Sequence, residues 1–212
     1  MNSPNDNFAM LKRMLEKRPP PGERCDFCAT SLTHEHSHLI ELAERRILCA
    51  CRPCAIVFEP AGAAQGRYRA VPTTYREVEG FALDDAAWDA LQVPIGLAFL
   101  FYNSIERRTV AFYPSPAGAI ESLLPLDTWA QIVALYPQLG EIAPDVEAIL
   151  IQRNREVSRA FVVPIDAAYE LVGTIRTSWK GFDGGREAHA KIAAYFDKVV
   201  ARSRGAVTAR RS

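Results

Sequence analysis

Residues 25–59 read CDFCATSLTHEHSHLIELAERRILCACRPCAIVFE and hold all five cysteines of the chain. Two cysteine pairs with two-residue gaps, Cys25/Cys28 and Cys51/Cys54, are separated by 22 residues. A two-residue gap lets a tight turn point both sulfurs of a pair at one ion, and two such turns complete a tetrahedral site. The spacing predicts a metal held by these four cysteines, and zinc is the first choice of metal.

Iron is the alternative to zinc, because rubredoxin-type sites use the same four thiolates for one-electron transfer. Turns of that type usually carry proline and glycine around the cysteines, so that backbone amides approach the sulfurs. Here the turns read CDFCA and CRPCA, with alanine where glycine is expected. Zinc is therefore favoured, and a rubredoxin-like electron carrier remains the second interpretation.

The fifth cysteine, Cys49, makes the ligand set ambiguous. The segment CAC places Cys49 and Cys51 on the same face of a strand, so either sulfur can reach the ion. Cys51 is favoured because it keeps the two-residue gap to Cys54. Cys49 is then a core residue at the strand end, or an alternate ligand.

Three of the four histidines lie between the cysteine pairs, in the segment HEHSH. His34, His36 and His38 alternate and can share one face of a strand, which allows a second metal site. Polar histidines on a surface loop explain the segment equally simply, and this interpretation is favoured. Replacement of one cysteine ligand by a histidine is the least favoured.

The rest of the chain divides by composition. Residues 1–21 combine an amphipathic helix with a proline-rich spacer, and residues 22–66 form the four-cysteine metal module, with HLIEL and RILCA as a hairpin between the pairs. Residues 67–201 alternate strand-like and helix-like segments, and residues 202–212 are a disordered basic tail. The expected fold is α+β. A zinc-ribbon or treble-clef-like module packs on a mixed or antiparallel sheet that has helices on one side.

Composition narrows the functional classes. Lys+Arg and Asp+Glu are both 25, so the chain has no basic excess for general nucleic-acid binding. The longest apolar run, residues 93–102, is far shorter than the roughly 20 residues that span a bilayer. No signal-peptide pattern is visible at the N-terminus, so a cytoplasmic protein is expected, with thiols free to bind metal.

Catalysis is not predicted. Four thiolates close a metal site, whereas a catalytic zinc keeps an open position. The sequence also lacks a G-x-S-x-G nucleophile motif, a phosphate-binding glycine loop and an H-E-x-x-H motif.

A second distinctive stretch, YELVGTIRTSWKGFDGGREAHAKIAAYF, covers residues 169–196. It predicts two helices joined by a glycine-rich turn with aromatic anchors. The alternative is a docking surface for a partner protein, with Arg176, Trp179, Lys180 and Arg186 as its exposed residues.

Together with the cysteine segment and GRYRAVP, the stretch LVGTIRTSWKGFDGG resembles an uncharacterised bacterial family. Its members are typically encoded beside actinobacterial-type, oxygen-tolerant, high-affinity nickel–iron hydrogenases. The resemblance covers about residues 25–196 and supplies no activity. It implies an accessory role in assembly, maturation or electron delivery, with a hydrogenase subunit or maturation factor as partner. The leading hypothesis is therefore a non-catalytic zinc-binding accessory protein.

Overall fold

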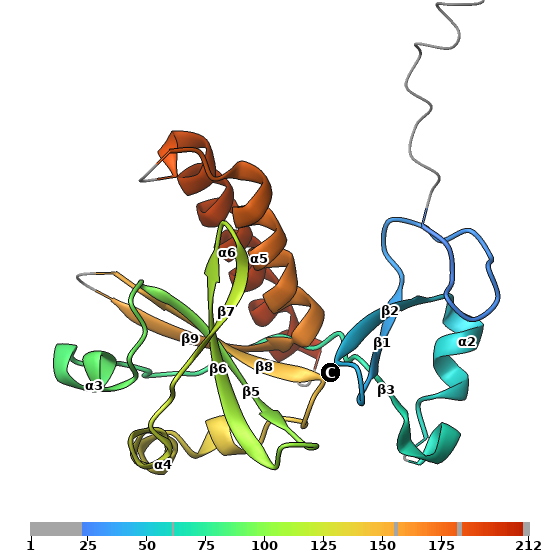
Figure 1. Ribbon diagram of the computed structural model, residues 1–212, viewed down its shortest axis with the longest axis horizontal. Coiled ribbons are helices and arrows are strands. Elements are labelled where there is room, and N and C mark those ends of the chain that lie inside the picture. Colours follow the sequence, from blue (N-terminus) through green and yellow to red (C-terminus); the bar gives the residue numbers. More distant parts are fainter. Residues whose placement is uncertain (1–22, 61, 155–156, 182–183, 210–212) are drawn as a thin grey trace, which may run out of the picture.

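The computed structural model describes residues 23–60, 62–154, 157–181 and 184–209. In these residues the chain forms two antiparallel sheets, one of three strands and one of six (Figure 1). The predicted α+β class with antiparallel sheet is thereby confirmed. The helix predicted within residues 1–21 lies outside the described residues.

The small unit consists of residues 23–60 and 62–70. Its sheet has the order β2-β1-β3, and its elements are β1 (Ser37–Glu41), β2 (Arg46–Ala50), α2 (Arg52–Val57), η1 (Ala63–Gly66) and β3 (Tyr68–Ala70). The hairpin predicted between the cysteine pairs is β1–β2, whose register pairs His38 with Cys49. β3 pairs with β1, so this sheet extends beyond the predicted boundary at residue 66.

The large unit is built on the six-stranded sheet, with strand order β4-β9-β8-β5-β6-β7. Its strands are β4 (Arg76–Glu77), β5 (Leu97–Asn103), β6 (Arg108–Ser115), β7 (Gly118–Ser122), β8 (Glu147–Arg153) and β9 (Ser158–Pro164). The central strands are rich in β-branched and aromatic residues, which favour extended structure. Their side chains are buried on both faces, which requires cover on each side.

Helices cover both faces of this sheet, which corrects the expectation of helices on one side (Figure 1). One face carries α5 (Ile165–Ser178) and α6 (Gly185–Ala209), packed on Phe99, Leu150 and Phe161. The other face carries α3 (Asp85–Ala90), α4 (Leu126–Leu135) and η2 (Pro137–Gly140). Alternate residues of each buried strand therefore point to opposite faces of the sheet and pack in two separate cores.

The termini of the helices follow local rules in part. The carboxylate of Asp84 accepts a hydrogen bond from the Ala87 amide, the usual contact of an aspartate that caps a helix, here α3. Asp127 lies inside the first turn of α4. α6 continues to Ala209, so most of the segment 202–212, expected to be disordered, is helical. Within the described residues, no helix is long and apolar enough to cross a membrane.

The small unit packs on the large unit through one face of its hairpin. Ile40 is 5% exposed and belongs to the same core as Phe161 and Leu171, and Ile47 packs against that core. Leu39, the neighbour of Ile40, lies in a separate small core on the opposite face. Alternation along β1 and β2 thus directs one set of side chains at α5 and the other set at the cysteines.

Candidate metal centre

Four cysteines meet on the outer face of the small sheet. Cys25, Cys28, Cys51 and Cys54 each place a sulfur within 4.8 Å of the others, and the sulfurs of Cys28 and Cys51 are 3.6 Å apart. The first pair lies in the turn that precedes β1, whereas Cys51 caps α2 and Cys54 lies inside that helix. A four-thiolate cluster of this compactness can bind a metal ion.

Local backbone structure shapes both turns. In the first turn the Ala29 amide donates to the Cys25 carbonyl at 2.8 Å, and Ala29 adopts a positive φ of 59°. The second cysteine turn leads into α2, which has a proline at its start, where a backbone N–H would have no helical partner. The Ala55 amide donates to the Cys51 carbonyl at 2.9 Å. Both turns therefore present their sulfurs to the same point.

The cluster is supported by a very small hydrophobic core. Its fully buried members are Cys25, Leu39, Leu48, Ala50 and Ala55. Three aromatic rings pack beside them: the Phe27 and Phe58 centroids are 4.8 Å apart, and Tyr68 lies 5.5 Å and 5.3 Å from these two rings. A core of this size stabilises little structure by itself.

Hydrogen bonding and burial separate the pKa values of the Cys28 and Cys54 thiols. The side chain and the amide of Thr30 lower the pKa of Cys28 to about 6, with Cys25 and Cys51 contributing. Hydrogen bonding with Cys51 and burial raise the pKa of Cys54 to about 12. Such divergence is expected where several thiols share one small space and cannot all ionise without a cation.

Cys49 is not part of this cluster. β2 ends at Ala50, so the alternation predicted for Cys49 and Cys51 does not continue to Cys51. Cys51 packs with Leu48 and Ala50 on the outer face, whereas Cys49 lies with His36 and His38 on the face toward α5. Burial, together with the nearby carboxylates of Glu23 and Asp26, raises the pKa of the Cys49 thiol.

The three histidines of the segment HEHSH do not act alike. One ring nitrogen each of His36 and His38, and the Cys49 sulfur, lie within 4.8 Å of one another. His34 is exposed and lies outside this group. Sequence reasoning missed Asp166 and Asp26, which hold this group in place. Asp166 is 128 positions from His38, so no local pattern could have indicated the contact.

The glycine-rich turn after α5 has the predicted backbone. Gly181, Gly184 and Gly185 all have positive φ, and a side chain at Gly184 would meet the Trp179 ring at 2.8 Å. Trp179 is half-buried against the core, in keeping with an aromatic anchor. The other residues of the predicted docking surface, Arg176, Lys180 and Arg186, are exposed, and Lys180 forms an ion pair with Glu187.

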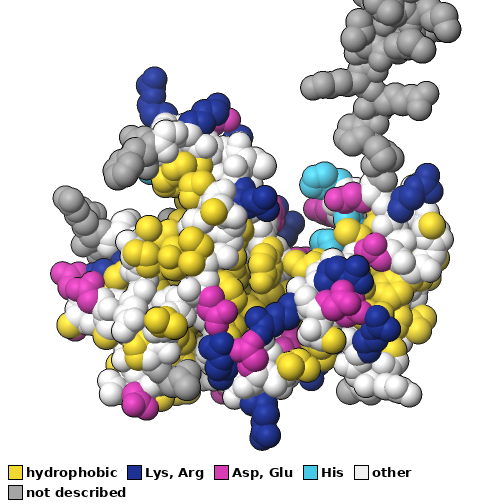
Figure 2. Space-filling model, in the orientation of Figure 1, with side chains coloured by type: hydrophobic (Ala, Val, Ile, Leu, Met, Phe, Trp, Pro, Cys, Tyr) yellow, Lys and Arg dark blue, Asp and Glu magenta, His cyan; other side chains and the backbone are white. Residues whose placement is uncertain are grey.

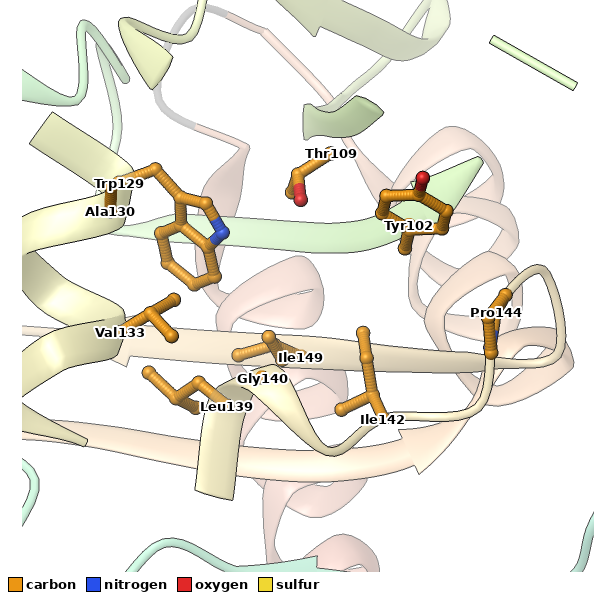
Figure 3. Close-up of a pocket in the computed structure, with 10 residues that line it drawn as sticks. All are labelled: Tyr102, Thr109, Trp129, Ala130, Val133, Leu139, Gly140, Ile142, Pro144 and Ile149. Atoms are coloured by element: carbon orange, nitrogen blue, oxygen red, sulfur yellow. The ribbon is translucent and has the colours of Figure 1, made fainter. Parts of the chain in front are cut away.

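A separate hollow of about 510 Å³ lies between α4, η2 and the sheet (Figure 3). The sticks show Trp129 and Val133 on the helix side, with Tyr102 and Thr109 on the strand side. In the described part of the chain no charged residue lines it, and its polar groups are two hydroxyls, one indole N–H and backbone. This composition suits an apolar occupant.

Comparisons with known proteins supply a family and no activity. No curated protein and no solved structure matches the chain. The model of a family described as "Family of unknown function (DUF5947)" matches residues 24–203. The match spans both units, from the first cysteine turn to the last helix. The chain therefore belongs to the family of unknown function DUF5947.

Proposed function

We propose that this protein is a non-catalytic zinc-binding accessory protein whose small unit is stabilised by one structural zinc. The observation that carries the proposal is the convergence of four cysteine sulfurs on two adjoining turns. Zinc prefers tetrahedral sulfur coordination in structural sites, and the paired two-residue gaps match that preference. A hairpin lies between the turns and a short helix follows them, and this order supports the proposal of a zinc-ribbon or treble-clef-like unit.

The four-thiolate set supports a structural role. With four protein ligands the ion has no open position for water or substrate. Among the described residues, five form the buried core on this face, so we expect the free energy of metal binding to be the main source of its stability. A bound ion would also hold the β1–β2 hairpin in place by the face that carries the cysteines, with the opposite face of the hairpin toward α5.

A rubredoxin-like iron site is the second candidate. Ala29 adopts the left-handed conformation that glycine usually supplies in such turns, and backbone amides of Phe27 and Cys28 lie within reach of the Cys25 sulfur. This geometry supports iron as well as zinc. An iron site would make the protein an electron carrier for its partner enzyme.

The accessory role is proposed from the resemblance to a family encoded beside nickel–iron hydrogenases. We propose a cytoplasmic protein that contacts a hydrogenase subunit or maturation factor. The surface of Arg176, Trp179, Lys180 and Arg186 is the proposed contact, since three of these residues are exposed. Charge reversal at Arg176 and Arg186 is expected to weaken partner capture without changing metal content.

Elemental mass spectrometry with visible absorption tests the metal. Protein purified without added metal and dialysed against a mild chelator is expected to keep about one zinc per chain and to be colourless. Cys54→Ser should lose that zinc, whereas Cys49→Ser should retain it. Iron with charge-transfer bands would favour the electron carrier, and absence of a retained metal would overturn the proposal.

A further inference from the structure

We propose that His36, His38 and Cys49 form a second metal site, distinct from the four-cysteine cluster. It would bind a divalent transition-metal ion through two imidazole nitrogens and one thiolate, and it would leave one coordination position open. The three ligand atoms lie within 4.8 Å of one another, as do those of the four-cysteine cluster. One ion can contact all three ligand atoms at this spacing, given metal–ligand distances of about 2.0–2.3 Å.

The hairpin register brings these ligands together. His38 lies directly opposite Cys49 in the β1–β2 pair, and His36 precedes β1 by one residue. The imidazole rings of His36 and His38 have centroids 4.6 Å apart and an interplanar angle of 64°. Two of the three ligands, His38 and Cys49, therefore lie on a strand pair, which holds them more precisely than a loop would.

His36 supplies an independent sign of a missing ligand. Only 5% of its side-chain surface is exposed. Its Nδ1 is 3.0 Å from the Thr33 carbonyl, which can only accept a hydrogen bond, so Nδ1 carries the proton. Its Nε2 is then a bare acceptor, and this atom is buried with no hydrogen-bond partner among the residues that the structure describes. Buried polar atoms are normally paired, and a metal ion at Nε2 would satisfy this one.

His38 is oriented by a carboxylate from the other unit. Its Nδ1 lies 2.6 Å from Oδ2 of Asp166, in the first turn of α5, while Oδ1 of Asp166 accepts from the Ala167 amide. A carboxylate on one imidazole nitrogen is the usual support for a histidine that binds metal through the other. Asp166 therefore acts as a positioning residue for the site.

Asp26 connects the two metal sites. Its amide donates to the Cys49 carbonyl at 2.9 Å, and its carboxylate accepts from the Cys49 amide at 2.6 Å. Asp26 stands between Cys25 and Cys28 in the first cysteine turn. The order of that turn thus helps to determine where the Cys49 backbone lies, and with it the third ligand.

The ligand set specifies the class of ion. Imidazole and thiolate suit zinc, cobalt, nickel, copper and iron, whereas magnesium and calcium require oxygen ligands. Three protein ligands leave room for water or another small ligand, unlike the closed four-cysteine cluster. A hollow of about 670 Å³ connects the site with solvent; its lining includes His34, His36, His38, Asp166 and residues of α6. Figure 2 shows histidine side chains gathered at this edge of the small unit.

A nucleophilic triad of Cys49, His38 and Asp166 is the competing use of the same atoms. It would give no role to His36, whose buried Nε2 points to a ligand. The metal site uses all four residues.

Cobalt(II) titration tests the proposal on the full chain that holds its first metal at the four-cysteine cluster. We expect one further equivalent of cobalt, with visible d–d bands and a near-ultraviolet thiolate-to-cobalt band of single-thiolate intensity. His36→Gln, His38→Gln and Cys49→Ser should each lower cobalt affinity at least 10-fold and keep the first equivalent. Asp166→Asn should weaken binding roughly 10- to 100-fold, with the bands retained.

His34→Gln is the matched control, because His34 is a nearby exposed histidine outside the group. It should bind cobalt like the wild-type chain. Equal cobalt affinity in wild type, His36→Gln and His38→Gln would overturn the proposal, as would the absence of a thiolate-to-cobalt band in the wild type. The wild-type spectrum decides the matter even if a variant fails to fold.

Discussion

Nδ1 of His38 and Oδ2 of Asp166 are 2.6 Å apart, and this pair joins the small unit to the first turn of α5 across 128 positions of sequence. Both side chains are about one-quarter exposed, so the contact is shielded in part from solvent. It lies beside Ile40, where the apolar contact between the units begins. The polar and apolar contacts together determine how the small unit sits on the large one.

Replacement of Asp166 by Asn should loosen that junction. The amide cannot offer the charged acceptor, so we expect the free energy of unfolding to fall by about 1 kcal/mol. Urea unfolding of the wild-type chain and of Asp166→Asn measures this difference in free energy. Glu170→Gln, in the same helix, removes only an exposed pair with Lys198 and should have a smaller effect. Equal effects of both changes would show that the His38–Asp166 contact adds no stability.

Ile40→Ala tests the apolar part of the junction. Ile40 is 5% exposed in the core shared with the large unit, so truncation should lower the free energy of unfolding by about 3 kcal/mol. Ile56→Ala is the control, because Ile56 is 47% exposed and should change stability by less than about 0.5 kcal/mol. Similar losses from both variants would contradict the assigned packing.

Cys25→Ser or Cys54→Ser should unfold the small unit selectively. If the proposed structural ion is bound, the small core of this unit should depend on it, whereas the described residues of both large-sheet cores include no cysteine or histidine. Hydrogen exchange should show loss of protection in β1 and β2 while β5 and β8 stay protected. Loss of protection throughout would show that the large sheet does not stay folded without the small unit.

Glu41 gives the small unit a defined pH dependence. Its carboxylate is 1% exposed and accepts hydrogen bonds from Arg67 and Arg46, which lower its pKa below the ordinary 4.5. Because the folded state lowers this pKa, ionised Glu41 contributes its full share to the free energy of unfolding above about pH 4.5. This contribution is lost as pH falls through the lowered pKa. Thermal unfolding of wild type and Glu41→Gln should differ at pH 7 and converge in acid. A difference that stays constant down to pH 3 would contradict this.

Gly184→Ala should disrupt the turn between α5 and α6. A Cβ there would approach the Trp179 ring at 2.8 Å in addition to straining a φ of 83°. We expect a loss of at least about 2 kcal/mol from strain and overpacking. Gly62→Ala has nearly the same φ, 85°, but no atom within 4 Å, so it isolates the backbone strain and should cost about 1 kcal/mol. Thermal unfolding of both variants separates backbone strain from the clash with the Trp179 ring. Equal losses of stability would show that the clash adds nothing.

Much of the local structure could be predicted from the sequence. The β1–β2 hairpin, the strands around residues 97–115, the Asp84 cap and the positive φ of Gly184 all follow from short-range rules. The predictions failed where the outcome depends on distant packing. Helices cover both faces of the large sheet, and β3 joins the small sheet, because pairing and burial partners lie far apart in the sequence.

The sequence by itself determined that four cysteines in two tight turns would converge, since a two-residue gap constrains both sulfurs through local backbone geometry. Only the tertiary structure decided the place of Cys49 and of the histidines. β2 ends at Ala50, so the side chains of Cys49 and Cys51 lie on different faces of the small sheet. Asp166, in α5, lies beside His38. The end of a strand depends on its pairing partners, and the arrival of a distant carboxylate depends on how two units pack; neither is a property of a short segment.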